Sequence, residues 1–216
     1  MSTTQNIKLA SVNSTSAGAG GLEGSVTRTV TSHVPGEVGI WAFIITDLAV
    51  FSLYFVTFLW ERGQAQALFA MDSALLNMTI GVVSTIVLLT SSLFVALGVQ
   101  AVRNGRGAAA QKHLIAAAAG GLVFIINKPI DWTAKVGAGH GPHHDNFFQL
   151  YFMMTGLHLL HVIVGMAVLA YLWRMAGTIK MVPNARQMRF IENGASYWHL
   201  VDVIWLVLFA LFYLVK

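Results

Sequence analysis

Apolar residues fill five long runs of the chain, and short polar segments separate these runs. Each run reaches or exceeds the roughly 20 residues that a helix needs to cross the hydrocarbon core of a bilayer. The runs cover residues 36–60, 75–102, 108–132, 147–173 and 195–215. We therefore predict an all-α fold, an integral membrane bundle of five transmembrane helices.

The third run has the shortest uninterrupted apolar core, residues 114–126, with Lys112 and Lys128 close to its two ends. A re-entrant or interfacial segment is the alternative to a full crossing. Lys and Arg residues near span ends gather on the cytoplasmic side of a membrane. Without the distant Lys8, five crossings place eight of them on one side and four on the other, whereas four crossings place seven against five. We therefore predict five crossings, with a cytoplasmic N-terminus and a periplasmic C-terminus.

Residues 1–34 differ from the rest, because they are rich in Ser, Thr and Gly and contain few large apolar residues. Such a segment buries too little apolar surface to offset the entropy lost on ordering. It also lacks the continuous apolar region and the cleavage site of a signal peptide. We expect a disordered N-terminal tail over residues 1–34, followed by a five-helix transmembrane domain over residues 35–216.

Composition agrees with a membrane protein. Charged residues make up 10% of the chain and hydrophobic residues 56%, whereas about 25% of the residues in an average soluble domain are charged. The net charge of +4 arises from basic residues in loops, where they set topology, so we expect no nucleic-acid partner. The chain has no Cys, which excludes disulfides, iron–sulfur clusters, thiolate metal sites and covalent c-type haem.

Ionisable side chains within a membrane span cost at least a few kcal/mol, so each needs a partner or a function. Asp47 lies near the middle of the first predicted span. It is either a proton-handling or lipid-contacting carboxylate, or a structural carboxylate that is hydrogen-bonded within the bundle. The pattern leaves both interpretations open.

Histidines occur in the fourth and fifth spans. His158 and His161 are three residues apart and share one helix face, where we expect hydrogen bonds between helices rather than haem or metal ligation. In the fifth span, His199 and Asp202 also share a face, just after Trp198. This pair can satisfy its own hydrogen bonds or relay a proton, and we expect the structural role.

We predict that five of these side chains form one buried polar seam that fixes the helix bundle and contacts a lipid headgroup. The five are Asp47, His158, His161, His199 and Asp202, and we assign Trp198 to the same lipid-contacting seam.

Two further groups lie toward the predicted outer side. Asp131 follows Lys128 by three positions, so we expect a local surface ion pair, which contributes little to stability. His140, His143 and His144 lie in a Gly-rich loop. They are weak candidates for a divalent metal site, because so short a segment is not expected to aim all three rings at one ion.

Two strings in the last two spans resemble signatures of a known family. Residues 197–206, YWHLVDVIWL, resemble the Tyr-Trp-His signature of the subunit III family of haem–copper oxidases, with its following Asp and Trp. Residues 155–165, TGLHLLHVIVG, resemble the double-His signature of the same family. The resemblance extends from about residue 38 to residue 213 and leaves the leader outside.

This resemblance implies a cofactor-free accessory subunit of a terminal oxidase, in the plasma (inner) membrane of a bacterium and in aerobic respiratory electron transport. Its partners would be subunit I-like and subunit II-like proteins, with haem and copper in the catalytic subunit. Phospholipid would lie in a cleft between the first two helices and the rest. The subunit would stabilise the catalytic subunit and support proton uptake. Five helices suggest the shorter bacterial form, which lacks the first two of seven.

The resemblance also assigns two carboxylates. Asp47 matches a glutamate in the first span of the family, and Asp131, which precedes Trp132, matches a glutamate at the outer end of the third helix. Both side chains are one methylene shorter than glutamate. The resemblance therefore implies a proton-related role for Asp47 and Asp131. Their carboxyl groups extend less far from the backbone than those of the family glutamates.

Three alternatives stay open at this point. Residues 146–152 are similar to family members associated with nitric oxide reductases, so the chain could serve such a reductase. A membrane cytochrome b would carry haem on His158, His161 and His199. A small transporter would more often show repeats with broken helices, but the sequence has no repeat and almost no Pro within its spans.

Overall fold

The computed structural model describes residues 38–179, 181 and 183–215, so the predicted tail of residues 1–34 lies outside the described residues. In this part of the chain the secondary structure is helical, without β-strands. The elements are α1 (Val38–Gln64), α2 (Gln66–Ala74), α3 (Met78–Arg103), α4 (Gly107–Gly137), α5 (Asn146–Thr178), α6 (Ala185–Phe209) and the π-helical turn η1 (Ala210–Leu214). Five helical stretches are long and apolar enough to cross a membrane. The predicted all-α, five-span fold is confirmed.

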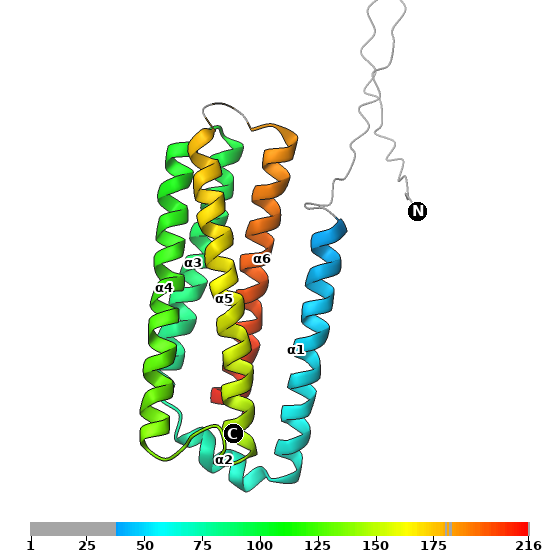
Figure 1. The fold of residues 1–216 in the computed structure, drawn as a ribbon, viewed down its shortest axis with the longest axis vertical. Coiled ribbons are helices and arrows are strands. Elements are labelled where there is room, and N and C mark those ends of the chain that lie inside the picture. Colours follow the sequence, from blue (N-terminus) through cyan, green and yellow to red (C-terminus); the bar gives the residue numbers. More distant parts are fainter. Residues whose placement is uncertain (1–37, 180, 182, 216) are drawn as a thin grey trace, which may run out of the picture. The chain divides into compact units, whose positions relative to one another are not determined.

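The third span is a full helix. α4 contains 31 residues, which corresponds to a length of about 46 Å at 1.5 Å per residue. It runs alongside the other long helices (Figure 1), so the re-entrant alternative is wrong. Lys128, at the C-terminal end of the apolar core of α4, does not interrupt the helix, and its side chain is buried inside the protein.

Three of the helices begin with a side-chain cap. The Asn77 side chain accepts hydrogen bonds from two backbone N–H groups at the start of α3, and the Asp145 side chain accepts one at the start of α5. At the start of α6, Asn184 and Gln187 form a reciprocal capping box. Such caps satisfy backbone donors that have no partner within the helix. They set the points at which the chain enters these spans.

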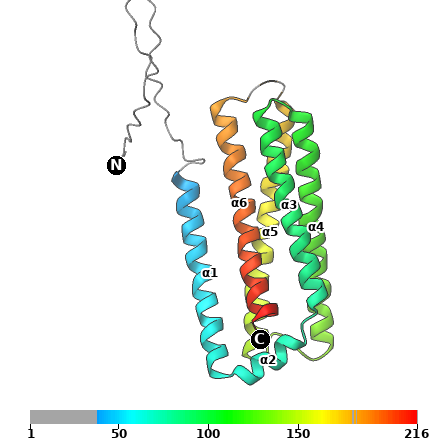
Figure 2. The same cartoon turned by 180° about the vertical axis from the view of Figure 1, so that it is seen from behind.

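Four of the long helices form a bundle, and α1 lies at its edge (Figures 1 and 2). α3 packs against α4 and α6, and α5 packs against the same two helices. α1 contacts α5 and α6, and the short α2 connects it to α3 while contacting α5 and η1. The sequence did not predict α2, because nine residues are too few to show a clear helical period.

This arrangement corrects one expectation. The resemblance implied a lipid cleft between the first two spans and the rest of the protein. The second span, α3, is instead an integral part of the bundle through its contacts with α4 and α6. The first two spans therefore do not form a separate unit, and α1 alone is peripheral.

Trp198 of α6 shows how the bundle closes around a large side chain. A Cβ atom on Gly121 of α4 or on Gly165 of α5 would lie within 2.7 to 2.8 Å of the Trp198 ring. The indole Nε1 of Trp198 donates to Ser91 Oγ of α3 at 3.1 Å, and this hydroxyl donates to the Ala117 carbonyl of α4 at 2.7 Å. The two glycines are therefore required by close packing.

Candidate functional site

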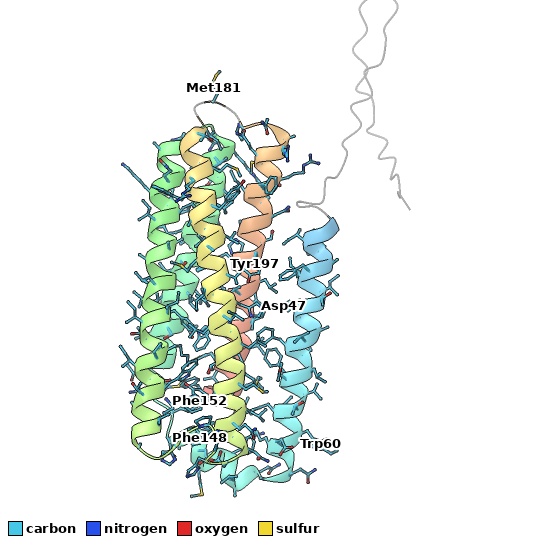
Figure 3. All side chains as sticks on the ribbon, in the orientation of Figure 1. Asp47, Trp60, Phe148, Phe152, Met181 and Tyr197 are labelled. Carbon is cyan, nitrogen blue, oxygen red and sulfur yellow. The ribbon has the colours of Figure 1, made fainter. Side chains whose placement is uncertain are left out.

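Asp47 of α1 and His161 of α5 form the polar link between the peripheral helix and the bundle. Asp47 Oδ1 lies 3.0 Å from His161 Nε2, and Figure 3 shows Asp47 on the side of α1 that faces the bundle. The ring of Phe51 packs edge-on against the imidazole, with the ring centroids 5.4 Å apart. Both side chains are largely buried. The predicted polar seam therefore contains one direct contact between helices that are distant in sequence.

The hydrogen bonds of His161 define the protons of this pair. His161 Nδ1 lies 2.7 Å from the Leu157 carbonyl oxygen, which can only accept, so Nδ1 carries a hydrogen. The bond between Nε2 and Asp47 then contains one shared proton, held either on the imidazole or on the carboxyl group. The pair is neutral as a unit in both cases. The shared proton lets the two buried groups remain hydrogen-bonded without a net charge in the membrane.

His158 lies three residues earlier on α5 but in different surroundings. Its side chain is fully buried, and neither ring nitrogen has a hydrogen-bond partner among the described residues. Phe124 meets the imidazole edge-on and Trp205 lies at a tilt, each with its ring centroid 5.4 Å away. This enclosure by the chain's own rings leaves no room for a haem plane, so the geometry does not support the cytochrome b alternative.

His199 and Asp202 of α6 face α3. His199 Nδ1 is hydrogen-bonded to Ser92 Oγ rather than to Asp202. Asp202 is buried, and neither of its carboxylate oxygens has a hydrogen-bond partner by distance and angle in the described part of the chain. Trp205, one turn further along α6, donates to Thr85 of α3 at 3.0 Å. The five seam residues thus occupy three separate places, and their functional roles stay predictions.

Asp131 belongs to a buried cluster. The expected ion pair with Lys128 is present, with Lys128 Nζ 3.6 Å from Asp131 Oδ2, but its expected position on the surface is wrong. Lys128 and Asp131 are only 2% and 3% exposed. The Tyr151 hydroxyl accepts from Lys128 Nζ at 2.9 Å and donates to Asp131 Oδ2 at 2.5 Å, while Lys135 pairs with Asp131 Oδ1. Lys128 Nζ also lies 4.9 Å from the centroid of the Trp205 ring, a distance typical of a cation–π contact.

Sequence reasoning missed Lys135 and Tyr151 in this cluster. One signal was present, because Lys128, Asp131 and Lys135 are spaced by three and four residues and therefore share a helix face. No comparable signal connected Tyr151, which lies on the next helix. Asp131 is buried because α5 covers the charged face of α4. The Tyr151 hydroxyl group of α5 bridges the Lys128 ammonium group and the Asp131 carboxylate.

The three loop histidines do not all meet at one point, although the rings of His140 and His144 pack edge-to-face with centroids 4.9 Å apart. His140 stacks on Phe148 with the centroids 5.1 Å apart, His144 Nδ1 lies 2.6 Å from Asp145 Oδ2, and His143 is exposed. Among the described residues no three His, Asp or Glu side chains are placed to hold one metal ion. The geometry therefore does not favour the weak metal candidates.

A groove of about 430 Å³ lies between α3 and α6. Its polar lining comes from Gln100 and Arg103 of α3 and from Glu192, Ser196 and His199 of α6. Arg103 and Glu192 form an ion pair of 2.8 Å across it. The groove thus combines apolar walls with donors and acceptors near one end of the bundle.

Comparison with known proteins identifies the family. The family model described as cytochrome c oxidase subunit III matches residues 16–216, which begins earlier than the resemblance at about residue 38 and includes part of the leader. The chain is 30% identical over 198 residues to the cytochrome c oxidase subunit 3 of Synechocystis sp., with 85% of this chain and 82% of the relative covered. It is 27% identical over 178 residues to the protein of the same name from Thermostichus vulcanus, covering 82% and 86%.

A third relative is larger. The heme-copper oxidase subunit I+III of Aeropyrum pernix is 25% identical over 185 residues, which cover 82% of this chain and 22% of the relative. The family match spans the five long helices and both signature strings of α5 and α6. The chain therefore belongs to the cytochrome c oxidase subunit III family, the third-subunit family of the haem–copper oxidases.

Proposed function

We propose that this multi-pass membrane protein stabilises the catalytic subunit of a haem–copper terminal oxidase in a bacterial plasma membrane, binds phospholipid and supports proton uptake. The observation that carries the proposal is the family match over residues 16–216. The haem and copper would reside in a subunit I-like partner, accompanied by a subunit II-like protein. A relative whose name joins subunits I and III supports the subunit I-like partner.

Surface chemistry supports a role in assembly. α1 exposes Ile45, Leu53 and Val56, each more than 60% accessible, and it contacts the bundle along one side only. Apolar side chains on a membrane helix are covered either by lipid or by another helix. A subunit I-like helix that packs beside α1 would hold this peripheral span in place, and loss of the contact would shorten the working life of the complex.

The groove between α3 and α6 supports a phospholipid site. Its Arg103 guanidinium group is exposed near the end of the bundle that carries most of the basic residues. Arg binds phosphate through two parallel hydrogen bonds, and basic pockets between membrane helices bind anionic headgroups. We place the headgroup at this end of the groove, instead of in a cleft beside the first two spans.

The pair of Asp47 and His161 supports the proton-related part of the proposal. The pair holds one shared proton near the middle of α1. Asp131, the second carboxylate that matches a family glutamate, is also hydrogen-bonded in the interior. Both carboxylates are held by protein donors rather than exposed to lipid. The Asp47–His161 pair is therefore suited to keep a proton near the catalytic subunit, whereas Asp131 is held as a carboxylate by Lys135 and Tyr151.

Substitutions at the α1–α5 link test the proposal. Asp47→Asn and His161→Ala should lower the yield of assembled complex, the amount of phospholipid that copurifies and the number of turnovers before inactivation. Thr46→Ala is the matched control, since Thr46 is exposed and bonds only to the Ala42 carbonyl of its own helix. Wild-type values of all three quantities in both variants would contradict the proposal.

The electron acceptor is part of the same proposal. The relatives described above are named as oxidase subunits, which favours oxygen over nitric oxide. Purification of the native complex, followed by identification of its largest subunit and haem type, tests this choice. A nitric oxide reductase catalytic subunit in that complex would overturn it.

A further inference from the structure

The groove between α3 and α6 continues as an apolar surface toward the middle of the bundle. The two helices pack side by side and run in opposite directions (Figure 2). One face of α3, with side chains spaced by three and four residues, consists of Arg103, Gln100, Ala96, Leu93, Leu89 and Ile86. The first three line the groove, and each of the last three is at least 45% exposed. Side chains at this spacing lie on one side of a helix, so this face of α3 is polar at one end and apolar further in.

The adjoining face of α6 changes in the same order. Its side chains at this spacing are Glu192, Ser196, His199, Val203 and Leu206. The first three line the groove, whereas Val203 is 50% and Leu206 36% exposed. A polar section followed by an apolar section matches an amphiphile whose long axis lies along the helices. In a bilayer this amphiphile is a lipid, with its headgroup in the groove and an acyl chain on the apolar section.

An ion pair crosses the polar section. Arg103 Nη2 lies 2.8 Å from Glu192 Oε1. A guanidinium group has five N–H donors and a carboxylate has two oxygens, so this contact leaves each group able to bind a further ion. The Arg103 side chain is 58% exposed, and exposed ion pairs contribute little to stability. The pair can therefore be shared with a ligand that brings one negative and one positive charge.

His199 supplies the deepest polar side chain of the groove. Its Nδ1 atom is hydrogen-bonded to Ser92 Oγ of α3, which holds the ring between the two helices. Nε2 is then the ring nitrogen that can meet a ligand. The apolar section begins one turn further along α6, at Val203. At this depth a phospholipid presents the ester carbonyls of its glycerol, to which an imidazole N–H can donate.

We propose that this groove selects a phospholipid whose headgroup carries a primary ammonium group, with the phosphate at Arg103 and the ammonium at Glu192. The inference rests on the proposed phospholipid site and adds the chemical class of the lipid. A glycerol headgroup has no cation, so its phosphate would lie beside the Glu192 carboxylate, and like charges placed together disfavour binding. A choline headgroup has a cation without N–H donors and cannot hydrogen-bond to Glu192.

Lipid retention by the purified complex tests the proposal. The complex is stripped with detergent, incubated with an equimolar mixture of dioleoyl phosphatidylethanolamine, phosphatidylglycerol and phosphatidylcholine, and analysed for bound lipid by native mass spectrometry. Ser196→Phe places a ring in the groove, so the lipid that this variant loses is the lipid of the groove. In the wild type that lipid should be phosphatidylethanolamine, in excess over each of the other two by about tenfold.

Two substitutions separate the roles of the charges. Glu192→Gln keeps an acceptor for Arg103 but removes the charge that attracts the ammonium, so the groove should hold a lipid without the preference. Arg103→Gln removes the phosphate site and should lower the retention of all three lipids in the groove by about tenfold. Arg106→Gln is the matched control, because Arg106 is also exposed but lines a different cavity. It should reproduce the wild-type result.

The possible failures have different meanings. If Ser196→Phe loses a lipid but the wild type holds the three lipids equally, or if Glu192→Gln keeps the wild-type preference, the inferred headgroup class is wrong and the proposed phospholipid site stands. If Ser196→Phe and Arg103→Gln both retain the wild-type amount of lipid, the groove holds no lipid. The phospholipid site of the proposed function then fails together with the inference.

Discussion

At the scale of single residues, the cluster around Asp131 shows how a bundle can bury two ammonium groups and a carboxylate. The donors follow one direction, from Lys128 to the Tyr151 hydroxyl and from that hydroxyl to Asp131, while Lys135 occupies the other carboxylate oxygen. These four polar groups are joined to one another by hydrogen bonds, which is the condition under which buried charges are tolerated. Tyr151 is the bridging residue, since it accepts from one charge and donates to the other.

Tyr151→Phe should therefore destabilise the protein. The substitution keeps the ring but leaves Lys128 without its acceptor and Asp131 without one donor, and an unsatisfied buried group costs about 1–3 kcal/mol. Thermal unfolding of the purified complex measures the effect. Tyr171→Phe is the matched control on the same helix, because Tyr171 is exposed. Equal shifts in the two variants would contradict the bridging role.

The sequence could indicate which buried ionisable residues need a partner, but it could not indicate which residue is the partner. Asp47 and His161 could be selected from the sequence alone, because an ionisable residue inside an apolar run requires a partner. The contact between them could not, since 114 residues separate the two. The burial of Asp131 was missed for the same reason: its environment depends on Tyr151 of another helix.

At the scale of elements, the two ends of α4 differ in how closely they meet the rest of the chain. Gly107, at its start, lies against the end of α5, and a Cβ atom there would overlap the backbone oxygens of Ala176 and Ile179. At Gly137, the last residue of α4, a Cβ atom would meet nothing within 4 Å. The start of α4 is therefore packed closely against the end of α5, whereas Gly137 at the C-terminal end of α4 has open space around it.

Substitution of these two glycines gives opposite expectations. Gly107→Ala should destabilise the bundle by about 1–3 kcal/mol, since backbone atoms must move to accept the methyl group. Gly137→Ala should leave stability unchanged or raise it by up to about 1 kcal/mol, because alanine loses less conformational entropy in a helix than glycine. Unfolding of both variants under one condition checks the contrast, and a neutral Gly107→Ala would refute the close approach.

At the scale of the whole molecule, the peripheral position of α1 is the main feature that helix lengths and hydropathy did not indicate. α1 is attached through the Asp47–His161 pair near its middle and through Phe58, whose ring packs against Phe69 of α2, Phe147 of α5 and Phe212 of η1. The other four spans cover one another. A partner subunit that covers α1 would therefore complete the fold.

The orientation in the membrane is a prediction at the same scale. The basic loops should lie in the cytoplasm, so the exposed Met181 between α5 and α6 should be cytoplasmic and the exposed His143 between α4 and α5 periplasmic. Because the chain has no Cys, Met181→Cys and His143→Cys each introduce one unique thiol. In intact cells an impermeant maleimide should label only His143→Cys. Labelling of Met181→Cys alone would reverse the orientation.

The sequence by itself determined the class of fold, the number of spans and the family. These properties depend on local hydropathy, helix length and two short strings, and each can be evaluated without knowing which helices touch. Even the weak third span could be predicted, because a fifth crossing places more of the loop Lys and Arg residues on one side of the membrane than four crossings do. The helix caps at Asn77, Asp145 and Asn184 are also local features, but they were identified only in the structure.

Only the tertiary structure decided which polar groups face each other. It pairs His161 with Asp47, His199 with Ser92 and Asp131 with Tyr151. In a membrane, lipid cannot supply hydrogen bonds, so the partners of these paired groups come from whichever helix packs against them. Packing between helices is a property of the assembled bundle, which is why these pairs were invisible in the linear pattern.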